Sequence, residues 1–218
     1  MSVAAFIPIK ANSERVKGKN FRPLAGKKLY LYILEHCMEA ACFDQIYIDT
    51  NSDEIKAYAA EHELGVIDRL DWLASNEANG NDLLVHHATV QPNYDYYFQL
   101  FATAPLLTPK TISDCVNQLT NSQTHDSIFT ATEDHGFYWF AGQPVNCRPG
   151  ILPRSQDAQH VMQETTGLYG ITGAAVRRYH CRIGAKPFFH LVDPIEALDI
   201  NTEHDFAYAE YVLSRMKR

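Results

Sequence analysis

Short apolar segments alternate along this chain with stretches of helical pattern, and this alternation restricts its fold more than any other feature. The first segment, Val3–Ile9, is apolar almost throughout, as expected of a strand buried on both faces of a parallel sheet. Further strands are predicted at Gln45–Asp49, Gly65–Ile67, Tyr94–Phe101, Asp126–Thr132, Thr166–Ile171 and Phe188–Val192. Helices are predicted at Leu29–Ala41, from Ser52 or Asp53 to His62, at Asn81–Thr89, from Thr108 or Pro109, and from Thr202.

Strands that alternate with helices form βαβ units, so the pattern predicts an α/β fold. We expect three layers, in which a mostly parallel sheet carries helices on both faces. Ligands of such sheets bind beyond the carboxyl ends of the strands, which directs attention to the loops after Ile9, Asp49, Ile67 and Phe101.

The segment Phe137–Arg154 (FYWFAGQPVNCRPGILPR) interrupts this pattern with aromatic, proline and glycine residues. It predicts an excursion from the sheet, which could be a hairpin, a lid or a subunit contact. The aromatic cluster Phe137–Phe140 is expected in a core or a subunit contact rather than at a cofactor. The sequence has no internal repeat, linker or low-complexity tract, so we expect a single domain over residues 1–218 with an embedded arm at about residues 135–165.

Composition excludes several classes of function. A net charge of -7 argues against a general nucleic-acid binder, which would present a basic face. The 5 cysteines show neither a CxxC pair nor a Cys/His metal spacing, so the sequence supports no disulfide framework and no zinc site. Without a signal-peptide pattern or an apolar run long enough to span a bilayer, we expect a reduced, cytoplasmic protein that does not associate with membranes.

The loop after the first strand concentrates positive charge in an otherwise acidic chain. Its cations are Lys10, Arg15, Lys17, Lys19 and Lys27, and Asn12, Ser13, Gly18 and Asn20 lie among them. A polyphosphate would explain this density, because cations and loop N–H groups offset its charge. A solvated basic loop is the alternative. The loop lacks the GxxxxGK[ST] pattern, which argues against a P-loop ATPase.

Two further segments allow functional and structural interpretations. Asp199 and Asn201 flank Ile200 before the last helix, where they could hold Mg²⁺ or merely end a strand or cap the helix. The turn Asn79-Gly80-Asn81 could contact a base, and Arg69 could reach a base or a phosphate. The alternative is an ordinary loop in which Asn81 or Asp82 caps a helix. Thr202, followed by Asp205, is expected to cap the last helix.

Taken in order, five segments resemble the acylneuraminate cytidylyltransferases, which include CMP-sialic acid synthetases and, more distantly, CMP-Kdo synthetases. These segments are IPIKANSERVKGKNFRPLAGKKL, IDTNSDEI, VIDRLDWLA, ATAPLLTPKTI and EALDINTEHDFAYAE, and the resemblance excludes Phe137–Glu164. It implies a nucleotide-diphospho-sugar transferase-like fold with a small dimerisation arm, and hence a homodimer. It also implies an enzyme that uses Mg²⁺ to join CTP to an acidic 2-keto-3-deoxy sugar, with release of pyrophosphate.

The resemblance also implies roles for residues. Lys10, Lys19 and Asp199 would be catalytic, and Asp199 and Asn201 would hold the metal. The nucleotide would contact Lys10, Asn12, Ser13, Arg15, Lys19, Asn20, Arg69, Asn79, Gly80 and Asn81. The acceptor would contact Gln99, Thr103, Arg154, Gln156 and Tyr169, although Tyr169 would also fit a core position. His86 and His87 are expected on a helix surface or in a core rather than in catalysis.

The chain departs from the family pattern at several positions. Lys10 stands where the family usually has Arg, Asn201 where a second metal-ligand Asp is frequent, and Gln99 two residues before the usual Gln. Arginines expected near Leu107 and Glu164 in sialic acid enzymes are absent, which leaves the identity of the sugar open. The cation for its carboxylate would be Arg148, Arg154, Arg182 or Lys186, of which Arg154 is favoured.

Two other functions remain open at this point. One is a nucleotidyltransferase of the same fold that acts on a sugar phosphate, an alcohol phosphate or a phosphonate. The other is a non-catalytic nucleotide-binding protein, which Lys10, Asn201 and the missing arginines would suit.

Overall fold

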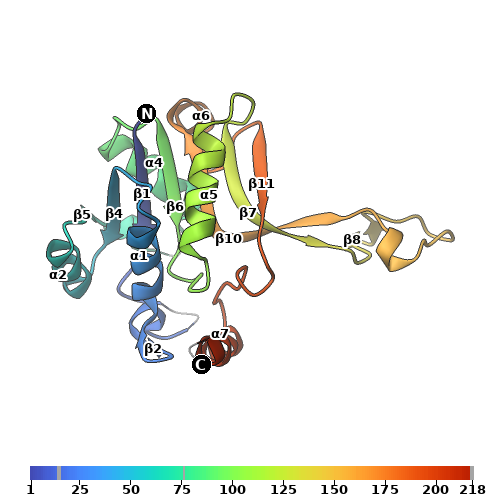
Figure 1. Ribbon diagram of the computed structural model, residues 1–218, viewed down its shortest axis with the longest axis horizontal. Coiled ribbons are helices and arrows are strands. Elements are labelled where there is room, and N and C mark those ends of the chain that lie inside the picture. The colour runs from blue at the N-terminus through green and yellow to red at the C-terminus, as the bar shows by residue number, and fades with distance from the viewer. Residues whose placement is uncertain (14–15, 76, 217–218) are drawn as a thin grey trace.

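A seven-stranded sheet forms the centre of the computed structural model, which describes residues 1–13, 16–75 and 77–216 (Figure 1). Its strands, in spatial order, are β11 (Pro187–Leu191), β7 (Ser127–Asp134), β10 (Val161–Thr172), β6 (Tyr96–Leu100), β1 (Val3–Pro8), β4 (Gln45–Thr50) and β5 (Gly65–Asp68). Strand β10 runs antiparallel to both of its neighbours, and the other pairs are parallel. Each of the seven predicted strands lies in this sheet, and the prediction of a mostly parallel sheet is confirmed.

Helices cover both faces of the sheet (Figure 1). On one face lie α1 (Leu29–Ala40), α2 (Asp53–Glu61) and α5 (Pro109–Thr120), and on the other lie α4 (Gly80–Val90) and α6 (Gly173–Tyr179). Strand β1 shows why its sequence is apolar throughout. Ala5 and Ile7 pack in the cluster that holds α1 and α5, whereas Ala4 and Phe6 pack in the one that holds α4 and α6. The predicted three-layer architecture is therefore confirmed.

The last helix, α7 (Glu203–Met216), packs outside these layers, against the short hairpin of β2 (Pro23–Leu24) and β3 (Lys27–Lys28). The predicted cap is present. Asp205 accepts a hydrogen bond from the Thr202 backbone N–H (2.8 Å), and the Thr202 hydroxyl accepts one from the Asp205 N–H (3.2 Å). Among the described residues, no helix is long and apolar enough to cross a membrane.

Helix α6 and three shorter helices were not predicted from the sequence. The three shorter helices are η1 (Lys19–Phe21), α3 (Asp71–Ala74) and η2 (Ser155–Asp157). Each spans about one turn, so none repeats an apolar pattern often enough to be recognised. Helix α6 has only seven residues and begins at Thr172, whose hydroxyl accepts from the Ala175 N–H.

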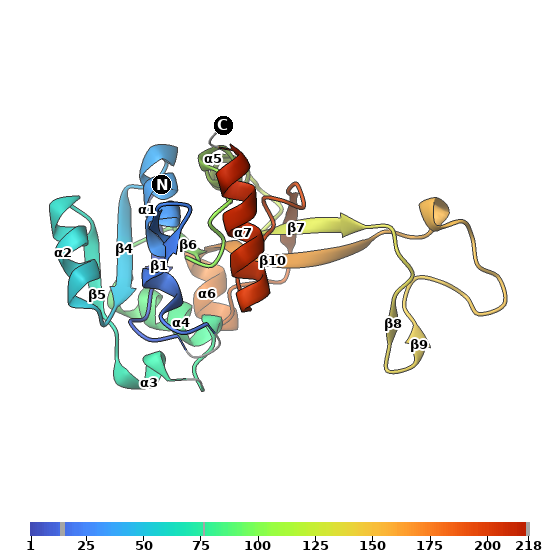
Figure 2. The same ribbon diagram turned by 90° about the horizontal axis from the view of Figure 1, so that it is seen from below.

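The predicted arm projects from one edge of the molecule (Figure 2). The far ends of β7 and β10 form its root, and the small hairpin of β8 (Trp139–Phe140) and β9 (Gln143–Pro144) lies beyond them with η2. The side chains of Trp139 and Phe140 are 56% and 78% exposed, so the core alternative for the aromatic cluster is wrong for these two residues.

Gly170 provides a test of the packing at the centre of the sheet. A Cβ atom there would lie 2.3 Å from Cε1 of Phe98 and 2.8 Å from Cγ2 of Ile128, both of which are buried. We expect Gly170→Ala to lower the free energy of unfolding by about 1–3 kcal/mol, because the side chains of Phe98 and Ile128 must shift within a packed core. Urea unfolding measures the change. Gly136→Ala, on the exposed arm, is the control, and an equal loss in both variants would contradict the packing argument.

Candidate functional site

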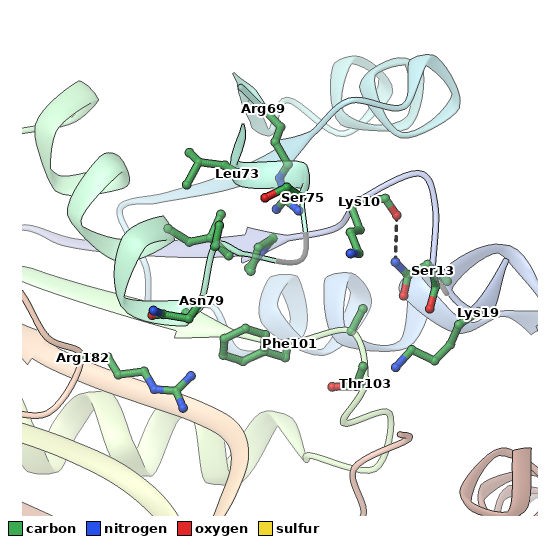
Figure 3. Close-up of a pocket in the computed structure, with 16 residues that line it drawn as sticks. Lys10, Ser13, Lys19, Arg69, Leu73, Ser75, Asn79, Phe101, Thr103 and Arg182 are labelled. Atoms are coloured by element: carbon green, nitrogen blue, oxygen red, sulfur yellow. Dashed lines mark hydrogen bonds between the residues drawn. The ribbon is translucent and has the colours of Figure 1, made fainter. Parts of the chain in front are cut away.

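A cleft of about 570 Å³ opens at the carboxyl ends of the parallel strands, where the fold places ligands. Its volume is that of a typical small-molecule site. Figure 3 shows side chains entering it from well-separated segments of the chain. Nine residues with predicted roles line it: Lys10, Ser13, Lys19, Asn20, Arg69, Asn79, Gly80, Thr103 and Arg182.

The loop after β1 is folded so that its two ends meet. The Asn20 side chain donates to the Lys10 carbonyl (3.0 Å), and the Ala11 N–H donates to the Asn51 side chain (2.8 Å). Gly18 precedes η1 with a φ of 62°, a left-handed conformation that glycine adopts at little cost. As a result Lys10 and Lys19, nine positions apart, both reach the cleft (Figure 3).

Lys19 connects this loop to the distant segment before α7. Its side chain is buried, and Nζ donates to the carbonyl of Ile200. The Ile200 N–H in turn donates to the carbonyl of Thr103 (2.8 Å). Residues from the beginning, middle and end of the chain are thus joined at one wall of the cleft.

Asp199 is held by two hydrogen bonds to one of its oxygens. Oδ2 accepts from the Thr166 hydroxyl (2.7 Å) and from the Asn201 side-chain amide (2.6 Å). Thr166 adopts a φ of 40°, which is rare for a β-branched residue, at an irregularity of β10 between Glu164 and Tyr169. This strained conformation directs its hydroxyl toward Asp199.

The second oxygen of Asp199 has the features expected of a cation ligand. Oδ1 is buried and has no hydrogen-bond partner among the described residues. A buried carboxylate oxygen without a partner is unusual, and an oxygen-preferring cation such as Mg²⁺ would satisfy it. Asn201 turns its amide nitrogen to Asp199, so here it orients the carboxylate. Neither residue lines the cleft itself, and the magnesium site stays a prediction.

The opposite wall rests on a buried carboxylate that the sequence analysis did not single out. Asp49, at the end of β4, accepts from Nε of Arg69 (2.8 Å) and from Nε2 of His87 (2.7 Å). Arg69 also donates to the Asp49 carbonyl (3.0 Å). All three side chains are buried, and the ring of His87 stacks on Phe6. Of the alternatives predicted for His87, the core position is therefore correct.

The charges in this group follow from burial and pairing. Burial alone would raise the pKa of Asp49, but the hydrogen bond from His87 and the charge of Arg69 outweigh it, so the pKa lies below its ordinary value. Burial lowers the pKa of His87, and its hydrogen bond to Asp49 offsets this only in part. Asp49 is therefore an anion, Arg69 a cation and His87 a neutral donor.

The turn before α4 is an ordinary cap as well as a wall of the cleft. Asn79, rather than Asn81 or Asp82, caps the helix, and Asp82 completes the capping box. The side chain of Asn81 accepts from the backbone N–H of Arg182 (3.0 Å). At position 80 there is no room for a side chain, because a Cβ atom there would lie 2.5 Å from Nη1 of Arg182.

Arg182 enters the cleft from the segment after α6 (Figure 3). Its guanidinium lies 3.8 Å from the ring centroid of Tyr169, and Nη2 is 3.2 Å from a Glu164 oxygen. Tyr169 is buried, donates its hydroxyl to Glu164 and does not line the cleft, so it occupies the core position foreseen as its alternative. Gln99 is fully buried behind the cleft and donates to the Gly80 carbonyl (3.0 Å).

Other predicted contacts lie elsewhere. Arg154 pairs with Asp157 on the exposed arm (2.6 Å), and Gln156 is exposed beside it. Asn12 is exposed, and Arg15 lies outside the described residues. Of the four cations considered for the acceptor carboxylate, Arg182 alone lines the cleft of the described structure, whereas Arg148, Arg154 and Lys186 do not.

Comparisons with known proteins identify relatives of this chain. A family model described as "Cytidylyltransferase" matches residues 4–212. The N-acylneuraminate cytidylyltransferase of Oncorhynchus mykiss is 26% identical over 216 residues, which cover 95% of this chain and 49% of that protein. The CMP-N,N'-diacetyllegionaminic acid synthase of Legionella pneumophila is 30% identical over 125 residues, 53% of this chain and 52% of that protein. The chain thus spans about half the length of these curated relatives.

A solved structure of a CMP:2-keto-3-deoxy-manno-octonic acid synthetase complexed with CTP has the same fold. Its TM-score is 0.72 at 14% sequence identity, over 99% of this chain and 100% of the other. At this identity the similarity establishes the architecture and no more.

The neutral state of buried His87 predicts a dependence of stability on pH. Because its folded pKa lies below that of an unfolded histidine, about 6.5, the folded protein binds fewer protons and loses stability as the pH falls below that value. We expect His87→Gln to reduce the slope of the unfolding free energy between pH 7 and 5 by up to about 1.4 kcal/mol per pH unit. Urea unfolding at several pH values measures it. His204→Gln, at an exposed residue of α7, is the control, and an unchanged slope in His87→Gln would contradict the assignment.

Proposed function

Because the chain belongs to the cytidylyltransferase family, we propose that it transfers the cytidylyl group of CTP to an acidic 2-keto-3-deoxy sugar and releases pyrophosphate. The observation that carries this proposal is the convergence of Lys10, Lys19, Arg69 and the Asn79–Gly80 turn in one cleft at the carboxyl edge of the sheet. This arrangement offers cations for a triphosphate and hydrogen-bonding groups for a base.

In this proposal the triphosphate lies along the loop after β1. Lys10, Ser13 and Lys19 contact phosphate oxygens, and Asn20 fixes the loop through the Lys10 carbonyl. Lys19 is the better candidate for the α-phosphate, because its side chain is buried and already oriented by Ile200. An oriented cation stabilises developing negative charge without reorganisation during the reaction. The acceptor hydroxyl attacks the α-phosphorus, and pyrophosphate leaves.

The cytidine lies between Arg69 and the turn before α4. Arg69 is fixed by Asp49, so its orientation costs little side-chain entropy when the nucleotide binds. Asn79 and Gly80 line the cleft there, and the missing side chain of Gly80 leaves room for the guanidinium of Arg182 beside the turn.

Asp199 is the proposed ligand of Mg²⁺ through its partnerless Oδ1, and Asn201 orients the carboxylate and could add its carboxamide oxygen. When bound, the ion would neutralise phosphate charge and lower the pKa of the attacking hydroxyl. Thr166 and Asn201 hold Asp199 in place for this role.

Arg182 is our candidate for the carboxylate of the acceptor, in place of Arg154 and Gln156. It lines the cleft near the Phe101 ring, and its contacts with Tyr169 and Glu164 fix the guanidinium plane. A guanidinium binds a carboxylate through two parallel hydrogen bonds, and it binds a phosphate in the same way. The same residue therefore also favours a second candidate, transfer to a phosphorylated acceptor.

We further propose a cytoplasmic homodimer that associates through the arm. Trp139, Phe140, Ile151 and Leu152 expose large apolar surfaces there. Such surfaces are seldom left open on a monomer.

A pyrophosphate-release assay tests the proposed reaction. With Mg²⁺, we expect turnover with CTP and not with UTP, ATP or GTP, in the presence of one member of a panel of sialic, legionaminic, pseudaminic and Kdo-type acids. Turnover with UTP or ATP only would refute the assignment to cytidine. Turnover only with sugar phosphates or alcohol phosphates would favour the second candidate, and Mg²⁺-dependent CTP binding without turnover would indicate a nucleotide-binding protein.

Variants in the same assay test the proposed catalytic roles of Lys19 and Asp199. We expect Lys19→Ala and Asp199→Ala to lower kcat at least about 100-fold while the circular dichroism spectrum stays unchanged. Lys17→Ala, an exposed cation of the same loop, should retain near-normal turnover. Near-normal rates in Lys19→Ala or Asp199→Ala would remove that residue from the proposed site.

Arg182→Gln tests recognition of the acceptor. Loss of a charge-assisted pair should raise the KM for the acidic sugar by about 10–100-fold and leave the KM for CTP within about threefold. Arg154→Gln is the matched control and should leave both values unchanged. If Arg154→Gln raised the KM for the acidic sugar and Arg182→Gln did not, carboxylate recognition would be assigned to Arg154 on the arm.

A further inference from the structure

A cluster of three potential metal ligands lies at the root of the arm, where β7 and β10 leave the sheet. Strand register brings it together. Val161 pairs with Asp134 and Met162 with Glu133, so the next pair in the same register is His160 with His135. Because side chains alternate between the two faces of a strand, Glu133 and His135 lie on the same face, and His160 faces them from the neighbouring strand.

The three side chains lie close enough together to share one ion. The potential ligand atoms of Glu133, His135 and His160 all lie within 4.8 Å of one another. Nδ1 of His160 is 2.5 Å from a Glu133 oxygen, and the two imidazole rings are 4.0 Å apart between centroids. All three residues are exposed, so an ion can reach them from solvent.

The neighbouring carboxylate does not belong to this cluster. Asp134 accepts a hydrogen bond from the side chain of Tyr138 and one from the Gly136 N–H (2.8 Å). Its side chain is therefore occupied on the other side of β7. The cluster keeps one carboxylate and two imidazoles.

We propose that Glu133, His135 and His160 form a binding site for Zn²⁺ or a similar divalent transition metal ion. Two imidazole nitrogens and one carboxylate oxygen are a common set of protein ligands for zinc, and they leave a fourth position for water. Mg²⁺ prefers oxygen ligands, so the nitrogen-rich set selects against it. The site is separate from Asp199, because His160, just before β10, lies six residues from Thr166, roughly 20 Å in an extended chain.

The position of the site gives the ion a structural role. It would tie together the chain segments just beyond the ends of β7 and β10, where the arm begins, and so fix the direction of the arm. An ion that binds the folded arm root and not the unfolded chain also stabilises the folded state. This inference does not depend on the proposed transfer of a cytidylyl group.

A competition titration with a chromophoric zinc indicator tests the proposal on the full-length, chelator-treated protein without nucleotide. We expect one Zn²⁺ per chain in the tightest step, undisturbed by a large excess of Mg²⁺. His135→Ala and His160→Ala should weaken that step at least tenfold, and Glu133→Gln several-fold. His62→Ala, at the end of α2 on the opposite side of the molecule from the arm, is the matched control and should bind as the parent does (Figure 1).

Limited proteolysis provides a second measurement. Zn²⁺ should slow cleavage within residues 137–154 of the parent protein and of His62→Ala, but not of His135→Ala or His160→Ala. Equal zinc affinity in the parent, His135→Ala and His160→Ala would overturn the proposal. So would the absence of stoichiometric binding by the parent at micromolar Zn²⁺.

Discussion

The buried carboxylate of Asp49 holds together the part of the molecule on which the cleft depends. It joins the end of β4 to Arg69, which follows β5, and to His87 on α4. Withdrawing one member of such a group leaves a buried charge without a partner, which typically costs about 3–5 kcal/mol. The same contacts that satisfy this charge also orient Arg69 toward the cleft. Stability of the sheet edge and geometry of the cleft therefore share one set of hydrogen bonds.

The other wall depends on contacts between residues that are remote in the sequence. Lys19 and Ile200 are 181 positions apart, and Thr103 lies between them in the chain but beside them in space. No local pattern encodes such a meeting. It follows from topology, because parallel strands deliver their following loops to the same edge of the sheet.

The sequence was sufficient to predict the seven strands and the long helices. Buried parallel strands such as β1 are apolar on both faces, and long helices repeat an apolar pattern over several turns. The antiparallel direction of β10 and the one-turn helices leave no such pattern. The cluster of cations after β1 drew attention to this loop, and both Lys10 and Lys19 line the cleft. Binding of a phosphate there stays a prediction.

The remaining site residues were harder to predict for physical reasons. Arg182 and Arg154 are both isolated cations in the sequence, and only the packing of Arg182 on Tyr169 places it in the cleft. Asp49 ends an apolar strand and resembles any turn residue until its partners are known. His135 and His160 are 25 positions apart, a separation typical of no metal motif, and strand register alone brings them together.

The irregularity in β10 has a consequence for how this chain can evolve. Glu164 pairs with Ala131 and Tyr169 with Phe129, so four residues of β10 stand opposite a single residue of β7. These residues are themselves held in place, Thr165 by Thr130 and Thr166 by Asp199. An insertion or deletion in the arm, beyond the pair Val161–Asp134, lies outside these contacts and can leave the pairing of Tyr169 with Gln99 unshifted. Lineages can vary the length and contacts of the arm while the hydroxyl of Thr166 keeps its place beside Asp199.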